Sequence, residues 1–128
     1  MKNACPEYEI PLALYAIIYI ISSMKPVEFL GSSQKDLREM PATARHALGI
    51  ELLAVQVGSE PKDWKPIPEV GAGAIEIRHR DENGAFRVIY VAKFSDAIYV
   101  LNAFQKKTQK TPRLEIELAA KRYKLIEG

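Results

Sequence analysis

The chain has 128 residues and a mass of 14.4 kDa, which is the size of one domain and enough to bury roughly two thirds of its unfolded surface without disulfides or metals. Its hydrophobic fraction of 48% and charged fraction of 27% are those of an ordinary globular protein. The single Cys5 excludes an internal disulfide framework and a cysteine zinc cluster, so a reducing cytoplasm is the expected location.

The formal net charge of +2 is unevenly distributed along the chain. Residues 1–64 carry 6 basic and 8 acidic side chains, whereas residues 65–128 carry 12 basic and 8 acidic ones. The first half is therefore slightly negative and the second half clearly positive. A positive field suits contact with a polyanion, although most basic faces are simply solvated.

An apolar run from Leu12 to Ile21 precedes the main pattern of the chain. Its ten residues fall short of the roughly twenty that span a bilayer, and the acidic residues before it argue against an export signal. We therefore expect no membrane partner. Because Met24 begins a stretch that reads as a natural domain start, we interpret residues 1–23 as an extension upstream of the working start and residues 24–128 as the domain.

The sequence after Met24 predicts an α+β fold with a short N-terminal strand, two helices, an antiparallel three-strand meander and a C-terminal helix. The first strand is expected at residues 27–30. Ser32 or Ser33 then begins a helix that ends near Met40. Apolar residues recur at helical spacing beyond it, which predicts a second helix that Gly58 ends.

The second half of the chain carries the strand pattern. Residues 59–73 are rich in proline and glycine and are predicted to form a loop. Residues 74–80 and 86–94 are rich in β-branched and aromatic side chains, and the DENG sequence between them is a strong hairpin signal. A third strand is expected at residues 97–104. A last helix is expected from Thr111-Pro112 to about Ile126.

Side-chain alternation predicts an arginine-rich face on the hairpin. Glu76, Arg78 and Arg80 share one face of the first strand, because side chains alternate sides with period two. A two-residue loop places Arg87 opposite Arg80, and a four-residue loop places it opposite Arg78. Both put Arg87 on the same face, whereas a three-residue loop would move it across the sheet.

Two interpretations of this face stay open. Directly opposed like charges are unfavourable in a strand pair, and a bound phosphate would offset the repulsion. Arginine suits such a ligand because its planar fork donates two hydrogen bonds to one phosphate. The alternative is a solvated face on which the arginines pair with Glu76, Asp81 or Glu82.

A cationic segment joins the last strand to the last helix. Residues 104–113 (FQKKTQKTPR) contain Lys106, Lys107, Lys110 and Arg113 and no acidic side chain. Since the strand before this segment is expected beside the hairpin, Lys106 and Lys107 are predicted to project over the arginine face. The two basic groups would then form one phosphate-binding site.

Other candidate residues are weaker. Trp64 with Lys65 is suited to stacking on an unpaired base, and Trp64 is equally suited to covering the edge of the core. His46 and His79 have no second ligand at metal-binding spacing, and His79 is expected on the face opposite Arg78. We therefore predict neither a metal site nor a cofactor.

A set of linked motifs also carries a resemblance to a known family. They are Asp63-Trp64-Lys65-Pro66, Gly71 and Gly73, Ile75-Glu76-Ile77-Arg78, Phe86-Arg87-Val88-Ile89-Tyr90 and Phe104-Gln105-Lys106-Lys107-Thr108. In their order and spacing they resemble HigB-like toxins of the RelE/ParE superfamily, across about residues 25–126. The resemblance implies a RelE-like fold, which is a compact antiparallel sheet flanked by helices.

The function implied by this resemblance is that of the toxin of a type II toxin–antitoxin pair. Such a toxin enters the ribosomal A site and cleaves the mRNA there as a ribosome-dependent endoribonuclease. The implied partners are the mRNA on the ribosome and a helix-turn-helix antitoxin.

The resemblance also assigns roles to residues by matching position. Arg78 and Arg87 would hold the scissile phosphate, and Lys106 or Lys107 would neutralise charge or transfer a proton. A lysine whose pKa is lowered by neighbouring cations, or Tyr123, would be the general base. The candidate residues that contact RNA are Lys65, Trp64, Lys110, Arg80 and Tyr123.

Two other functions remain as alternatives. ParE-like relatives share the fold and inhibit DNA gyrase without cutting RNA. A basic domain that binds RNA without catalysis would also explain the arginine face.

Overall fold

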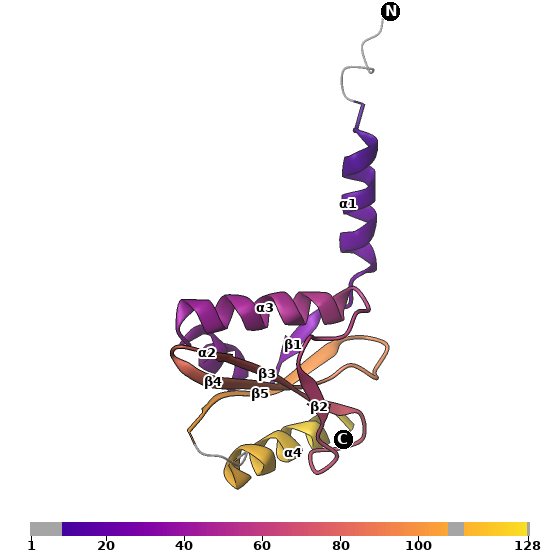
Figure 1. Cartoon of the computed structure of the whole chain (residues 1–128). Helices are drawn as coiled ribbons and strands as arrows, with labels where there is room; N and C mark the ends of the chain where they lie inside the picture. Colours follow the sequence, from indigo (N-terminus) through magenta and orange to yellow (C-terminus); the bar gives the residue numbers. More distant parts are fainter. Residues whose placement is uncertain (1–8, 108–111, 128) are drawn as a thin grey trace, which may run out of the picture.

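The computed structural model describes residues 9–107 and 112–127, in which helices cover both faces of a sheet (Figure 1). The α+β class predicted from the sequence is confirmed. The elements in chain order are α1 (Leu12–Ser23), β1 (Val27–Phe29), α2 (Ser33–Arg38), α3 (Ala42–Gln56), β2 (Trp64–Pro66), β3 (Ala74–Asp81), β4 (Gly84–Val91), β5 (Ile98–Lys106) and α4 (Arg113–Glu127).

Within the described residues the sheet has five strands in the order β1-β5-β4-β3-β2. β1 pairs with β5 in parallel, and every other neighbouring pair is antiparallel. The sequence prediction missed β2, which pairs with β3 inside the segment expected to be a loop. A three-residue strand is too short to show alternation, and Pro66, which has no N–H to donate, is tolerated because β2 lies at the edge.

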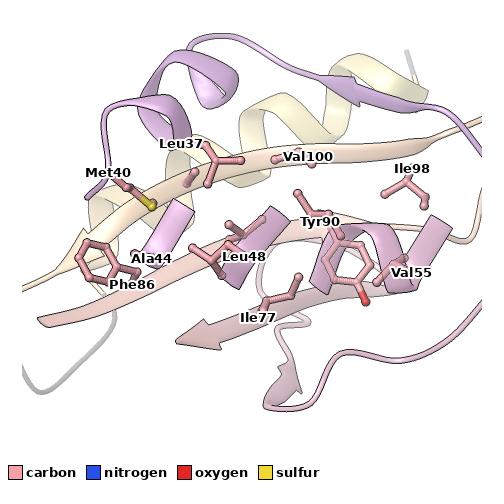
Figure 2. Packing of buried hydrophobic residues seen from close by; sticks show 13 residues of the cluster. Leu37, Met40, Ala44, Leu48, Val55, Ile77, Phe86, Tyr90, Ile98 and Val100 are labelled. Carbon is pink, nitrogen blue, oxygen red and sulfur yellow. The ribbon is translucent and has the colours of Figure 1, made fainter. Parts of the chain in front are cut away.

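One hydrophobic core lies between the sheet and the helices α2 and α3 (Figure 2). The apolar residues of α3 recur three or four positions apart, so they form one face that packs on the sheet. The buried α3 residues are Ala44, Leu48, Leu52 and Val55, and the sheet contributes Ile77, Phe86, Val88, Tyr90, Ile98 and Val100.

A second core lies between the sheet and α4 on the opposite face (Figure 1). It contains Ile89, Val91, Leu101 and Phe104 from the strands together with Ala119 and Tyr123 from α4. The sheet is therefore apolar on both faces along much of its length. Positions where this pattern is interrupted by charge are candidates for function.

The β3–β4 hairpin adopts one of the two registers expected from the sequence. Arg78 pairs with Arg87, and the last pair before the turn is Asp81 with Gly84. The turn is stabilised because the Asp81 carboxylate accepts a hydrogen bond from the backbone N–H of Asn83 at 2.8 Å. Gly84 has a φ of 126°, a conformation that L side chains rarely adopt.

A β-bulge interrupts the pairing of β4 with β5. Tyr90 pairs with Val100, but the preceding residue Ile89 pairs with Asn102, so Leu101 is the extra residue. A guanidinium N–H of the buried Arg122 in α4 donates to the Leu101 carbonyl oxygen at 2.8 Å. The bulge therefore has a specific partner in the helix above it.

The helix α1 projects away from the sheet beyond the end of α3 (Figure 1). None of its residues is buried, although it is composed almost entirely of apolar side chains. Among the described residues no helix is both long and apolar enough to cross a membrane.

Candidate functional site

Five basic side chains from four strands gather on the face of the sheet that α4 partly covers. Cross-strand pairing sets their positions in three rows: Lys65 beside Glu76, then Arg78 beside Arg87, then Arg80 and Lys106 on either side of Ala85. We call this group the cationic cluster; its members are Lys65, Arg78, Arg80, Arg87 and Lys106.

The carboxylate of Glu76 organises the centre of the cationic cluster. Glu76 is fully buried, and its Oε1 atom lies 3.8 Å from both Lys65 Nζ and Arg87 Nε. Burial of a carboxylate is costly unless it is compensated by opposite charge. The two cations supply that compensation, so Glu76 fixes the positions of Lys65 and Arg87 on the sheet.

Arg87 is the most enclosed cation of the cluster. Its Nη1 atom donates to the Phe86 carbonyl oxygen at 3.0 Å. Burial lowers the pKa of Arg87, Glu76 opposes that change, and the neighbouring Arg78 and Arg80 lower it further. Arginine still keeps its proton at physiological pH, so Arg87 supplies a fixed positive charge to the site.

Arg78 is positioned by Asp63, which immediately precedes β2. The guanidinium of Arg78 donates to Asp63 Oδ1 from Nη2 at 2.8 Å and from Nε at 3.1 Å. The backbone N–H of Arg78 also donates to the Asp63 carbonyl oxygen. Sequence reasoning missed this role of Asp63, because the contact depends on the unpredicted pairing of β2 with β3.

Arg80 and Lys106 complete the cluster near the hairpin turn. Arg80 is exposed and forms no ion pair with any residue in the described part of the chain. Burial lowers the pKa of the Lys106 amine, and the charge of Arg87 lowers it further. These two residues therefore add to the site an exposed guanidinium and an amine that releases its proton more easily than that of an ordinary lysine.

Lys107 does not join the cationic cluster. It lies just beyond β5 and lines a separate cavity of about 360 Å³ together with Asp36 and Glu39 near α2. The bulge at Leu101 explains this outcome, because one extra residue exchanges the faces of all later side chains in the strand. The bulge thereby places Lys106, rather than Lys107, on the face of the sheet that carries Arg78, Arg80 and Arg87.

Three other candidates have different positions. Trp64 pairs with Ile77 and Lys65 with Glu76, so alternation places Trp64 and Lys65 on opposite faces of the sheet rather than together on one base. Tyr123 is buried in the second core, and its hydroxyl donates to the Ala72 carbonyl oxygen at 2.7 Å. Tyr123 is therefore a packing residue. Lys110 lies outside the described residues.

His79 lies on the face opposite the cationic cluster, as the alternation predicted. Its Nε2 atom is 2.9 Å from Asp81 Oδ2, and its ring lies beside Phe86 with the centroids 6.4 Å apart. Thr43 of α3 donates to the same Asp81 carboxylate at 3.1 Å. This contact ties the hairpin tip to the start of α3.

No group of three His, Cys, Asp or Glu side chains suited to a metal ion occurs in the described ranges. The described side chains of the cationic cluster supply preorganised charge. Five cations against the carboxylates of Glu76 and Asp63 leave an excess of positive charge facing solvent beside α4. Such an arrangement binds an anion and stabilises negative charge that develops on it.

Comparison with known proteins identifies the family to which the chain belongs. The family model described as "Phage derived protein Gp49-like (DUF891)" matches residues 35–124, so the chain belongs to this family of RelE-like, toxin-type proteins. A search of curated proteins finds no match. The matched range includes all five members of the cationic cluster and excludes α1.

Proposed function

We propose that this protein is the toxin of a type II toxin–antitoxin pair and acts as a ribosome-dependent mRNA endonuclease. The observation that carries the proposal is the convergence of the cationic cluster from β2, β3, β4 and β5 in a chain of a toxin-like family. Its proposed partners are mRNA on the ribosome and a helix-turn-helix antitoxin, and its proposed location is the cytoplasm.

The proposed reaction uses the RNA as its own nucleophile. The ribose 2′-hydroxyl attacks the adjacent phosphorus, the bond from phosphorus to the 5′ oxygen breaks, and a cyclic phosphate and a 5′-hydroxyl end form. The protein aligns the attack and stabilises charge on the nonbridging phosphate oxygens. Positioned cations in a partly dehydrated site contribute several kcal/mol to such a step.

The geometry suits the members of the cationic cluster to different roles. Arg78 and Arg87 are held by Asp63 and Glu76 at fixed positions, so they suit the role of gripping the phosphate. Lys106 is the proposed proton-transfer group, because burial and the charge of Arg87 lower the pKa of its amine. Arg80 and Lys65 extend the positive surface along the RNA backbone.

A reconstituted translation assay tests this function. Purified ribosomes carrying a defined message are incubated with the protein, and cut sites are mapped by primer extension; we expect cleavage only when the message is on the ribosome. The double variant Arg80→Gln/Lys106→Gln should lower the cleavage rate at least 100-fold while retaining its fold by circular dichroism.

The same preparation distinguishes the alternative functions. Inhibition of gyrase supercoiling without any mRNA cleavage would contradict the proposal in favour of a ParE-like activity. RNA binding without cleavage or gyrase inhibition would identify a noncatalytic RNA-binding domain. Adding the protein product of the neighbouring open reading frame should abolish cleavage if the antitoxin assignment is correct.

A further inference from the structure

The helix α1 has no charged side chain and is apolar around its whole circumference. Leu12, Tyr15, Ile17, Tyr19 and Ile21 are each more than half exposed. Contiguous exposed apolar surface of more than a few hundred Å² marks a site of interaction. An isolated helix of 12 residues is also marginal in water, so α1 requires a partner that covers it.

A cavity of about 630 Å³ opens where α1 meets the rest of the domain. Ile20 of α1, Val55 of α3, Trp64 and Tyr90 contribute to its lining, and Figure 2 shows the Tyr90 ring beside Val55. Tyr90 is 5% exposed, and its hydroxyl forms no hydrogen bond with any described residue. The hydroxyl oxygen is not among the buried atoms that lack a partner, so it is accessible from the cavity and can bond to a group that enters there.

The charges that flank α1 indicate what covers it. Glu9 precedes the helix and Lys25 follows it, and each stands eight positions from Ile17 at the centre. Two α1 helices aligned antiparallel about Ile17 therefore place Glu9 of each copy beside Lys25 of the other. Lys25 donates one hydrogen bond to the Ala92 carbonyl oxygen and retains two N–H donors for that pair.

We propose that a second copy of this chain covers α1, with the two α1 helices packed antiparallel about a two-fold axis at Ile17. The contact is self-complementary, as a two-fold interface must be. Leu14 of one copy lies opposite Ile20 of the other, at the mouth of the cavity that Tyr90 lines. The start of each α1 thus closes the cavity of its partner.

A bilayer fits α1 less well than a second copy does. A helix of this length extends about 18 Å, against about 30 Å of bilayer hydrocarbon. Helices that lie in the membrane surface have a charged face rich in Lys and Arg, which α1 lacks. Glu9 would also be repelled by an anionic lipid surface.

The available area is consistent with a stable dimer. Eight large side chains between Leu12 and Ile21 are exposed, and each offers on the order of 100 Å² of apolar surface. About half of that surface faces one partner. Leu53 of α3 and Val57 just beyond it add to this surface, which brings the total to roughly 500–600 Å² per partner, or about the 1,000 Å² in all that a specific interface needs.

Sedimentation velocity of the full chain without detergent tests the proposal. We expect the wild type to sediment as a species with twice the chain mass of 14.4 kDa. The double variant Ile17→Glu/Ile18→Glu places four carboxylates at the crossing point and should weaken the dimer at least 100-fold. The control Leu114→Glu/Leu125→Glu adds the same charge at two more exposed apolar positions of α4 and should remain dimeric.

Cysteine cross-linking tests the direction of the helices. In a Cys5→Ser background, mild oxidation should join two copies through Ile17→Cys or Ile18→Cys at the two-fold axis. The Leu12→Cys variant should give no covalent dimer, because its two copies would be about 15 Å apart along the helices. Equal cross-linking at Leu12 would show a parallel pair and overturn the antiparallel arrangement.

Other outcomes would overturn the dimer itself. They are a monomeric or polydisperse wild type, a dimer that survives Ile17→Glu/Ile18→Glu, and recruitment to neutral lipid vesicles in place of self-association. The proposal also requires that residues 9–23 belong to the native product, in contrast to the interpretation of Met24 as the working start. A native mass that begins at Met24 would end it, with no consequence for the proposed RNA cleavage.

Discussion

Arg78 stands directly opposite Arg87 in the β3–β4 ladder, and each of the two arginines has its own carboxylate. Asp63 binds Arg78 from the edge of the sheet, and the buried Glu76 lies beside Arg87. Each acid offsets part of the like-charge repulsion without covering the accessible surface of the cluster. The two guanidinium groups are therefore held in place before any ligand arrives, which is what rapid stabilisation of a developing charge requires.

Removal of Arg87 should destabilise the fold strongly. The variant Arg87→Ala removes one of the cations that lie 3.8 Å from the buried Glu76 carboxylate, and we expect a loss of about 3 kcal/mol in the free energy of unfolding measured with urea. Arg80→Ala is the matched control, because Arg80 is exposed, and it should change stability by less than about 0.5 kcal/mol. Equal effects at the two positions would contradict the role assigned to Glu76.

The two adjacent lysines at the end of β5 should differ in their effect on activity. Lys106→Ala removes a cation of the cluster and should lower ribosome-dependent cleavage about 100-fold. Lys107→Ala should lower it less than about threefold, since Lys107 lines the cavity near α2. Cleavage rates on programmed ribosomes provide the measurement, and a larger loss at Lys107 would refute the assignment.

The contact between His79 and Asp81 should make the hairpin tip sensitive to acid. The hydrogen bond from His79 holds the pKa of Asp81 below its usual value of 3.8. A lowered folded-state pKa gives stability that is present above pH 3.8 and is lost as pH falls through the folded pKa. Melting temperatures between pH 5 and pH 2.5 should show a steeper acid loss for the wild type than for Asp81→Asn.

The control for that experiment is Glu82→Gln, which removes an exposed carboxylate of the same turn. It should follow the wild-type profile, because no contact in the described residues depends on that carboxylate. A wild type and an Asp81→Asn variant with parallel profiles would argue against the contact.

Two glycines should respond in opposite ways to alanine. A Cβ atom at Gly71 would lie 2.6 Å from the buried Tyr123 ring, so Gly71→Ala should cost about 1–3 kcal/mol. Gly49 lies in α3 with nothing within 4 Å of its added Cβ, so Gly49→Ala should stabilise the protein by about 0.5–1 kcal/mol. Thermal melts of the two variants test both signs.

Arg122 should influence activity from a distance through the bulge. Arg122→Leu removes the donor to the Leu101 carbonyl oxygen, and we expect a loss of about 1–3 kcal/mol in unfolding free energy together with slower mRNA cleavage. The exposed neighbour Lys121→Leu should change neither quantity appreciably. If the Arg122→Leu variant is destabilised but folded and its cleavage rate is unchanged, the contact between Arg122 and the bulge does not influence the cationic cluster.

The sequence predicted the regular elements well because their patterns are long. The apolar spacing of α3 and the alternation in β3 and β4 identified those elements, and the face shared by Glu76, Arg78 and Arg87 followed from period two. The choice between two hairpin registers could not be made from the sequence, because both place Arg87 on the same face.

The parts that escaped prediction are short or depend on contacts between distant segments. β2 has three residues and contains Pro66, so its strand character comes from pairing with β3 rather than from its own composition. The role of Asp63 follows from that pairing. No local signal marks Leu101 as an extra residue, since its effect is visible only when β4 is aligned beside β5.

The bulge at Leu101 also affects how relatives of this protein are to be compared. A related chain of the same length whose β5 pairs with β4 without a bulge would present the second lysine of its Lys-Lys pair, rather than the first, to the arginines. An alignment by sequence columns would then match two lysines that lie on opposite sides of the sheet. Residues with the same role in this family therefore have to be identified by the face of the sheet on which they lie. That face has to be established from a structure before residues are compared.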